Sequence, residues 1–507
     1  MSMQDAHANG RHLRARRLGL DTHHEAVVLM HKDCPVCRSE GFSALSRVEL
    51  GVGDRRVVAT LHQVTGDWLA GDEAGLSESA WRRLGLTDGE TLTVVHADPV
   101  GSLAHVRSRV YGNRLSEAAL REIIGDIVKG QYTDVHLASF LTASATKPLD
   151  HDEVVALTRA MVEVGDRLRW KPAMVVDKHS VGGLPGNRTT PIIVSIVAAL
   201  GLTMPKTSSR AITSPAGTAD AMETLAPVDL DVADIHRVVE REGGCIAWGG
   251  AVRLSPADDI LIRVERALDI DTEGQMIASV LSKKIAAGST HVVLDVPVGP
   301  TAKVRSAQAA EALSAGLVAV AETFGMHVTI NLGDGLQPIG RGIGPALEAR
   351  DVLAVLQGAP GAPRDLRMRA VALAGSLVEL GGLAPDGAGA QVAADVLDDG
   401  RAWDKFQRIC EAQGGMRVPP VSHHRRPLLA DRSGSLALVD NRKIAKLAKL
   451  AGAPDDKAAG VALHVRLGDT VAAGEPLCTV HAESPGELAY ALDYAAANPG
   501  IFGIAPG

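Results

Sequence analysis

The sequence predicts an α/β protein of about three domains, and three observations lead to that prediction. The chain has 507 residues, too many for one hydrophobic core when domains hold roughly 100–200 residues each. Strand-like and helix-like runs alternate between residues 173 and about 380, as in a mixed sheet with helical cover. A composition of 46% hydrophobic but only 3% aromatic residues, with 53 glycines, fits aliphatic cores and many tight strand-to-helix turns.

Charge and hydropathy exclude several classes of protein. The formal net charge of −8 gives no electrostatic reason to expect nucleic-acid or membrane binding. No window approaches the roughly 18 uninterrupted apolar residues of a spanning helix. The arginines between residues 11 and 17 are not followed by an apolar h-region, so no secretory signal is expected. Five cysteines, an odd number, favour a reducing compartment, and we expect a cytoplasmic protein.

The first segment, residues 1–105, is expected to be a separate β-rich module. Residues 26–30, 57–61 and 91–95 are short β-branched runs, and the connectors between them carry Gly and Asp. A closely spaced pair, Cys34 and Cys37, lies in this module near three histidines. Reduced thiols in or near a turn are the favoured interpretation, because a second ligand pair at zinc-site spacing is missing; metal or redox use remains the alternative.

Helices are expected after residue 113. Ser116 is placed to cap a helix that runs through Val128, and Asp150 with Glu153 has the spacing of a capping box. Strands are then predicted by apolar runs at residues 173–176, 291–296 and 327–330. The C-terminal segment returns to β-structure, with strand-like runs at 460–465, 467–471 and 475–480 ahead of a helix at 487–498.

A glycine-rich stretch predicts an anion site. Residues 177–186 read Asp-Lys-His-Ser-Val-Gly-Gly-Leu-Pro-Gly, between the apolar run 173–176 and a helix-like run at 191–197. Glycines let the backbone approach a ligand with its N–H groups, and a helix N-terminus adds partial positive charge. Lys178 and Ser180 supply a cation and a hydroxyl at the same place.

A second candidate anion loop spans residues 206–220. It is dense in serine and threonine, carries Lys206 and Arg210, and lies between two apolar segments. Thr218 is placed to cap a helix over residues 219–225. Such loops are often solvated connectors, but this one comes directly after the helix that follows the first loop, which favours a binding role.

These motifs resemble those of a known enzyme family. Lys178-His179-Ser180-x-Gly182-Gly183 resembles the signature of the thymidine and pyrimidine-nucleoside phosphorylases. The run 185–187 and the loop 206–220 look more similar to AMP phosphorylases and to the longer "type 2" thymidine phosphorylases. The resemblance covers nearly the whole chain and continues through residues 254–259, 270–271 and 278–284.

The resemblance implies an architecture in which a helical lobe and an α/β domain face each other across a cleft. The helical lobe would comprise residues 106–170 and 254–286, and the α/β phosphate-binding domain residues 171–253 and 287–425. A C-terminal β-rich/α+β domain would follow at 426–507. The same resemblance implies a homodimer or larger homo-oligomer.

The reaction that the resemblance implies is phosphorolysis by a pentosyltransferase. Inorganic phosphate attacks C1′ of a (deoxy)ribosyl group and expels the base, and closure of the cleft excludes water. The expected partners are therefore phosphate and a small nucleoside or nucleotide. Phosphate would be a co-substrate, and neither a cofactor nor a metal is expected.

The resemblance also implies roles for particular residues. Lys178, Ser180, Ser209 and Thr218 would bind phosphate, His179 would lie beside the base or sugar, and Ser279 and Lys283, four apart on one helix face, would contact the base. Lys178, His179 and Asp271 would be the catalytic residues. Matching the AMP phosphorylases assigns nucleotide binding to Gly183, Ser209, Arg210, Ala211, Ile212, Thr213, Ser214, Thr218, Ser279 and Lys303.

Asp271 would protonate the leaving base, because an adenine anion leaves poorly and a carboxyl group with a raised pKa can supply the proton. Read from its neighbours alone, Asp271 is instead an ordinary N-cap of the helix that starts at Thr272-Glu273.

The substrate is left open between two classes. In the thymidine enzymes a threonine stands where this chain has Val181, and residues 184–187 also depart from their pattern. Arg210 and Lys303 could serve a 5′-phosphate through charge-assisted bonds. A nucleoside 5′-monophosphate, which would give ribose 1,5-bisphosphate, is therefore considered beside thymidine.

Two other functions compete with phosphorolysis. Anthranilate phosphoribosyltransferase shares the architecture but holds pyrophosphate and Mg²⁺, and this chain lacks paired acids beside its glycine-rich loop. A non-catalytic scaffold is the third interpretation, suggested only by the extra β module and its cysteine pair.

Overall fold

The computed structural model describes residues 12–211, 214–270 and 272–506, which form two compact units. Unit 1 holds residues up to Arg107 together with Gly125–Leu137, and unit 2 holds Ser108–Ile124 together with Ala138–Gly507. Three helices contribute residues to both units: α4 (Leu103–Val110), α5 (Glu117–Val128) and α6 (Asp134–Thr146). None of the described helices is long and apolar enough to cross a membrane.

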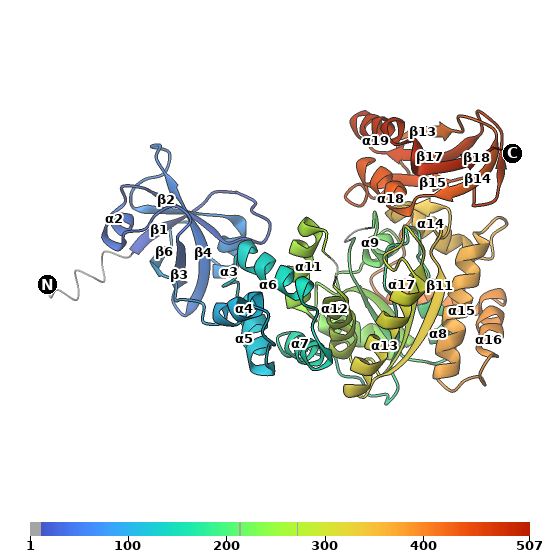
Figure 1. Cartoon of the computed structure of the whole chain (residues 1–507), viewed down its shortest axis with the longest axis horizontal. Coiled ribbons are helices and arrows are strands. Elements are labelled where there is room, and N and C mark those ends of the chain that lie inside the picture. Colours follow the sequence, from blue (N-terminus) through green and yellow to red (C-terminus); the bar gives the residue numbers. More distant parts are fainter. Residues whose placement is uncertain (1–11, 212–213, 271, 507) are drawn as a thin grey trace. The chain divides into compact units, whose positions relative to one another are not determined.

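Unit 1 contains a closed six-stranded barrel, in agreement with the β-rich module that the sequence predicts (Figure 1). Apolar side chains at alternate positions of its strands fill the interior, among them Val28, Leu50 and Leu61. The barrel order is β1 (His12–Arg17), β5 (Glu73–Leu76), β2 (Val27–His31), β4 (Arg55–Val64), β3 (Arg47–Val52) and β6 (Thr91–His96), with α2 (Pro35–Glu40) and α3 (Glu78–Leu84) in the connections.

Unit 2 is built on parallel strands with helical cover, the α/β arrangement that the alternating pattern predicts (Figure 1). Its strands are β7 (Val176–Ser180), β10 (His291–Val298) and β11 (His327–Asp334) in one sheet and β8 (Met204–Ser208) with β9 (Gly244–Trp248) in a second. The helices are α7 (His151–Glu163), α8 (Thr190–Ala199), α9 (Thr218–Glu223), α10 (Val232–Glu242), α11 (Pro256–Leu268), α12 (Glu273–Ala286), α13 (Ala307–Thr323), α14 (Pro345–Leu356), α15 (Arg364–Leu380), α16 (Gly389–Asp398) and α17 (Arg401–Ala412).

A C-terminal body of strands and two helices belongs to the same unit. Strand β12 (Gly342–Ile343) pairs with β15, which fastens this body to the α/β part beside α14 (Figure 1). Its elements are β13 (His424–Leu429), β14 (Gly434–Val439), α18 (Asn441–Leu450), β15 (Gly460–Leu463), β16 (Thr470–Val471), β17 (Pro476–Ala482), α19 (Pro485–Ala497), a short 3₁₀ turn at Pro499–Ile501 and β18 (Phe502–Ala505).

Local signals place most helix starts correctly. The Ser116 hydroxyl accepts a hydrogen bond from the Ala119 amide at the start of α5, and the capping box of Asp150 and Glu153 begins α7. Thr218, however, is the first residue of α9 rather than its N-cap, which is Gly217. The cap prediction for Thr218 is wrong because its hydroxyl is engaged elsewhere, by Arg188.

Candidate active site

Lys178 lies in strand β7 and is almost fully buried. Residues 178–180 are strand rather than loop, because β7 pairs in parallel with β10 as far as Ser180. The Lys178 ammonium donates to the Thr189 hydroxyl (3.0 Å) and stands 3.7 Å from the Asp295 carboxylate. Burial lowers the pKa of Lys178 to about 8, although Asp295 opposes this effect. The cation is therefore held at a site with little competing water.

Asp295 is the buried acid that balances this cation. Arg369 approaches it at 2.5 Å and the Asn187 amide donates to it at 3.0 Å. Burial would raise the pKa of Asp295, but Lys178 and Arg369 lower it, so the carboxylate is charged. Asn187 also donates to the Ser180 hydroxyl (3.2 Å), which leaves the proton of that hydroxyl available to an acceptor.

The glycines of the first loop allow close approach of a second segment. Gly183 has φ = +80°, and a Cβ atom there would overlap the backbone nitrogen of Lys303. The structure thus brings Gly183 and Lys303 together from distant parts of the sequence, as expected if both belong to one site. Two buried polar atoms, Asn187 Oδ1 just beyond this loop and Ser208 Oγ at the end of β8, have no hydrogen-bond partner among the described residues.

The second loop is folded around Asp220. This buried carboxylate accepts from the amides of Ala211 (2.6 Å) and Gly217 (2.8 Å), which closes the loop at both ends. Arg210 lies over the Trp248 ring at 4.7 Å and pairs with Glu223 at 2.8 Å. Hydrogen bonds with Arg210 lower the pKa of Glu223 to about 2. The Arg210 charge is thus already matched by neighbouring carboxylates.

Arg188 joins the two loops. Its guanidinium pairs with Glu348 at 2.6 Å and donates to the Thr218 hydroxyl (2.6 Å) and the Ala216 carbonyl (2.9 Å). No role was predicted from the sequence for Arg188 or Asp295, and Asn187 was recognised only as part of the motif at residues 185–187. Charged or amide residues between a glycine loop and an apolar helix, or inside an apolar strand, are the signals that could have found them.

Helix α12 carries Ser279 and Lys283 on one face. Lys283 forms an ion pair with the buried Asp258 of α11, which raises the pKa of Lys283 against the effect of burial. The next residue, Lys284, points to a different partner, the Asp177 carboxylate, at 2.6 Å. Lys206 reaches the same carboxylate at 3.2 Å, so a buried ionic cluster connects α12 with β7 and β8.

His179 lies next to Lys178 on β7 and is surrounded by lysines. Burial, followed by the charges of Lys284 and Lys206, lowers the pKa of His179 well below its usual value. The imidazole is therefore neutral at physiological pH, so one ring nitrogen can donate a hydrogen bond and the other can accept one.

Some of the predicted residues lie outside the described ones: Ile212, Thr213 and Asp271. Ser214 is described, and its hydroxyl donates to the Ala216 carbonyl at 2.8 Å. The N-cap of α12 is Thr272, whose hydroxyl accepts a hydrogen bond from the Gln275 amide.

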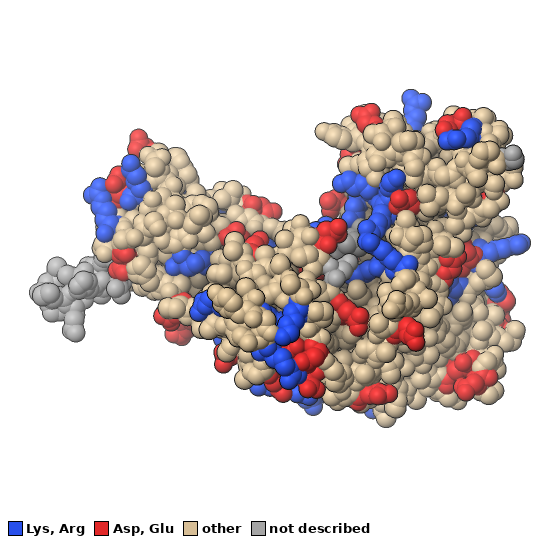
Figure 2. All heavy atoms as spheres, in the orientation of Figure 1, with Lys and Arg blue, Asp and Glu red and all other residues tan. Residues whose placement is uncertain are grey.

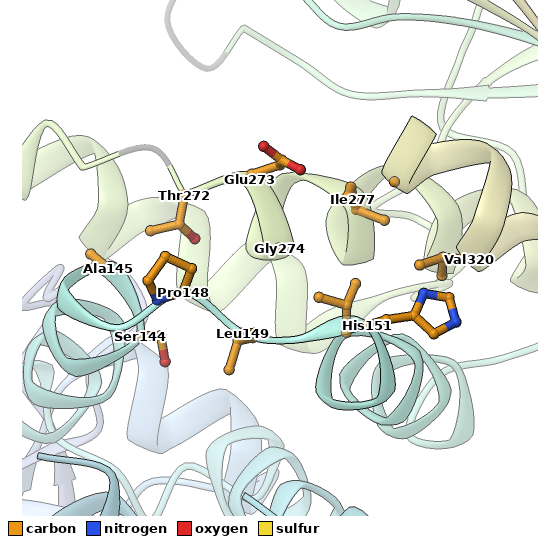
Figure 3. Close-up of a pocket in the computed structure, with 12 residues that line it drawn as sticks. Ser144, Ala145, Pro148, Leu149, His151, Thr272, Glu273, Gly274, Ile277 and Val320 are labelled. Carbon is orange, nitrogen blue, oxygen red and sulfur yellow. The ribbon is translucent and has the colours of Figure 1, made fainter. Parts of the chain in front are cut away.

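A cavity of about 480 Å³ lies between α6, α7, α12 and α13 (Figure 3). Gly274 and Ile277 of α12 line it, and Ser279, two residues beyond Ile277, points to roughly the opposite side of the helix. None of the described residues predicted for the site lines this cavity. The candidate site therefore lies on the other face of α12.

Charge is unevenly distributed on one face of the molecule. On the face drawn in Figure 2, acidic and basic side chains are mostly interspersed, but Lys and Arg side chains gather in the hollow beside the C-terminal body.

All five cysteines are free and buried, and the Cys37 backbone amide donates a hydrogen bond to Cys34 Sγ at 3.1 Å. Among the described residues, no group of three or more His, Cys, Asp or Glu side chains could hold a metal ion.

Family comparisons match three stretches of the chain. They are described as "Glycosyl transferase family, helical bundle domain" for residues 104–165, "Glycosyl transferase family, a/b domain" for 172–403 and "Pyrimidine nucleoside phosphorylase C-terminal domain" for 436–501. With the fold, these matches define the class: the chain is an enzyme of the pentosyltransferase type.

Full-length relatives narrow that class. A "Putative thymidine phosphorylase" from Polaromonas sp. (strain JS666) is 62% identical over 486 residues, 96% of this chain and 95% of the relative. One of the same name from Chelativorans sp. (strain BNC1) is 64% identical over 485 residues, with the same coverage of both chains. The chain therefore belongs to the thymidine and pyrimidine-nucleoside phosphorylase family.

A solved structure supports the fold. Anthranilate phosphoribosyltransferase from Thermus thermophilus is similar with a TM-score of 0.50 and 21% identity, over 61% of this chain and 98% of that one. At this identity the similarity shows the shared fold alone.

Proposed function

We propose that the protein catalyses phosphate-dependent cleavage of the N-glycosidic bond of a nucleoside or nucleoside 5′-monophosphate. The products would be the free base and (deoxy)ribose 1-phosphate or ribose 1,5-bisphosphate. The observation that carries the proposal is the buried Lys178 of β7, held between Thr189 and Asp295 beside the glycine-rich loop, which Arg188 joins to a second hydroxyl-rich loop.

Phosphate would bind between the two loops. Lys178 supplies charge in a site of low water content, where an ammonium ion attracts an anion more strongly than at an exposed surface. The hydroxyls of Ser180 and Thr218 each accept one hydrogen bond from the protein, so their own protons can be donated to phosphate oxygens. Ser209 completes the proposed ligand set. These contacts would orient one oxygen toward C1′.

The nucleoside would lie against α12. Ser279 and Lys283 would contact the base, with Lys283 held by Asp258, and the neutral His179 would face the base or sugar. Gly183 and Lys303, which are in contact, would border the nucleotide together with residues 209–214. Asp271 would donate the proton to the leaving base.

Two classes of substrate, nucleosides and nucleoside 5′-monophosphates, are compatible with the proposal. Relatives carry the name thymidine phosphorylase, while the loop motifs are more similar to AMP phosphorylases. Arg210 and Lys303 are both candidates for a 5′-phosphate contact, and three carboxylates, those of Asp220, Glu223 and Asp229, already surround Arg210. We further propose a cytoplasmic homo-oligomer that needs no metal or cofactor.

The test is base release by the purified protein, with and without phosphate, from AMP, CMP, UMP, adenosine, uridine and thymidine. Release from monophosphates only would identify a nucleotide phosphorylase, and release from thymidine or uridine a nucleoside phosphorylase. Turnover must persist in a metal chelator. Activity that requires Mg²⁺ and a pyrophosphorylated sugar would favour a phosphoribosyltransferase, and no phosphate-dependent release from any substrate would refute phosphorolysis.

A further inference from the structure

Arg188 occupies the junction between the two loops of the site. It follows the glycine-rich loop directly and lies one residue before Thr189, the hydroxyl partner of Lys178. Its Nη1 donates to the Thr218 hydroxyl (2.6 Å) and its Nη2 to the Ala216 carbonyl (2.9 Å). The side chain of Arg188 thus contacts the start of α9 and the end of the second loop, while its backbone follows the first loop.

Glu348 of α14 fixes the guanidinium from the other side. Arg188 Nε donates to Glu348 Oε2 at 2.7 Å and Nη2 lies 2.6 Å from the same oxygen, while Glu348 Oε1 accepts from the Gly344 amide. Arg188 is only 8% exposed and Glu348 only 1%. A planar guanidinium can make these contacts together, whereas a lysine ammonium at the end of a flexible chain cannot reproduce the fork.

The contact decides what the Thr218 hydroxyl can do. A hydroxyl that accepts a hydrogen bond still holds one proton to donate. With Arg188 as its donor, the Thr218 hydroxyl is oriented so that its proton is given to another acceptor. Because the guanidinium is charged, the bond is also stronger than one between neutral groups.

We infer that Arg188 is a positioning residue for phosphate, which sets the Thr218 hydroxyl as a donor and holds the two loops at a fixed separation. This inference rests on the proposed function. Arg188 acts through Thr218 and through the backbone at Ala216, and it contributes to phosphate binding rather than to recognition of the base.

The principal test is Arg188→Lys, which keeps a positive charge beside Glu348 but loses the fork. The Michaelis constant for phosphate is expected to rise about 10- to 100-fold, the effect of losing one or two charge-assisted hydrogen bonds, while the constant for the nucleoside changes less than about threefold.

A matched control separates positioning from folding. Arg109 is also buried, pairs with Glu153 at 3.1 Å and donates to the carbonyls of Asn113 and Lys147. Arg109→Lys removes a comparable fork away from both loops. It is expected to lower the melting temperature about as much as Arg188→Lys and to leave the Michaelis constant for phosphate unchanged.

A double-mutant cycle tests whether Arg188 acts on phosphate binding through the Thr218 hydroxyl. In a Thr218→Val background, Arg188→Lys should raise the phosphate constant by much less than in the wild type, because the shared hydroxyl is gone. A full effect in that background, or an Arg188→Lys effect no larger than that of Arg109→Lys, would overturn the inference.

Failure of the inference can be told apart from failure of the proposed function. If the wild type releases no base, titration calorimetry with inorganic phosphate alone still compares the variants. Weaker phosphate binding by Arg188→Lys than by Arg109→Lys would uphold the positioning role without phosphorolysis. Equal affinities, or no phosphate binding by the wild type, would overturn it.

Discussion

Replacement of Lys178 by methionine should remove most phosphate-dependent activity while the fold survives. Lys178 is the buried cation of strand β7, just before the first loop, and water cannot easily take its place because only 2% of the residue is exposed. A hydrogen bond to a charged group contributes about 1.5–3 kcal/mol, and each 1.4 kcal/mol corresponds to tenfold. We therefore expect the specificity constant for phosphate to fall by roughly 10- to 100-fold, and closer to 100-fold than to 10-fold.

The fold should tolerate this change because Asp295 keeps other partners. Arg369 at 2.5 Å and Asn187 at 3.0 Å are both closer to Asp295 than Lys178 is, at 3.7 Å. The cost should be well below the roughly 3–5 kcal/mol typical of a broken buried pair. Asp295→Asn removes the carboxylate partner of the buried Lys178 and of the partly buried Arg369, and should instead cost about that full amount.

The assay is steady-state base release at varied phosphate, with urea unfolding of each variant. Lys171→Met is the control, since Lys171 makes a surface pair with Glu240. The reasoning is refuted if Lys178→Met keeps the wild-type specificity constant for phosphate, or if Lys178→Met and Asp295→Asn are equally destabilised.

Three other outcomes are expected. Because burial lowers the pKa of Lys178 to about 8, phosphate binding should weaken as pH rises through 8. Between pH 8 and the ordinary lysine pKa of 10.5 the unfolded chain binds more protons than the folded one, so this group alone makes folding more favourable as pH rises. The loss of phosphate binding should therefore occur without a fall in melting temperature. A phosphate Michaelis constant that is flat from about pH 7 to 10 would contradict this. Asp258→Asn removes the ion-pair partner of Lys283 and should raise the Michaelis constant for the nucleoside about tenfold, with little change in the Michaelis constant for phosphate. Initial rates measured while each substrate is varied in turn would check this. Lys284→Met should lower the free energy of unfolding in urea by about 3 kcal/mol, which is near the lower limit for a broken buried pair because Lys206 remains beside Asp177. An unchanged urea midpoint would be inconsistent with the buried ionic cluster.

Features with a local cause could be predicted from the sequence. The capping box of Asp150 and Glu153 is set by two side chains three residues apart, and it is present as predicted. The glycine turn after β7 could be predicted because Gly182 and Gly183 follow a strand-like run, and both glycines have positive φ in the structure. The anion-binding role of this turn and of the second loop stays a prediction.

Features with a distant cause could not be predicted. Strand β7 extends over Lys178 and Ser180 because β10, far later in the chain, pairs with it. The cap expected at Thr218 fails because Arg188, 30 residues earlier, takes its hydroxyl. The partner of Arg188 is 160 residues away, at Glu348, and no local pattern connects the two.

The central claim is that phosphate itself becomes part of the sugar product. Phosphorus NMR of a reaction with the best substrate of the panel tests it most directly, since it follows inorganic phosphate and any sugar 1-phosphate together. We expect a sugar 1-phosphate, or ribose 1,5-bisphosphate from a monophosphate, to appear in an amount equal to that of the released base. Release of base with an unphosphorylated C1′, or with inorganic phosphate unconsumed, would contradict it.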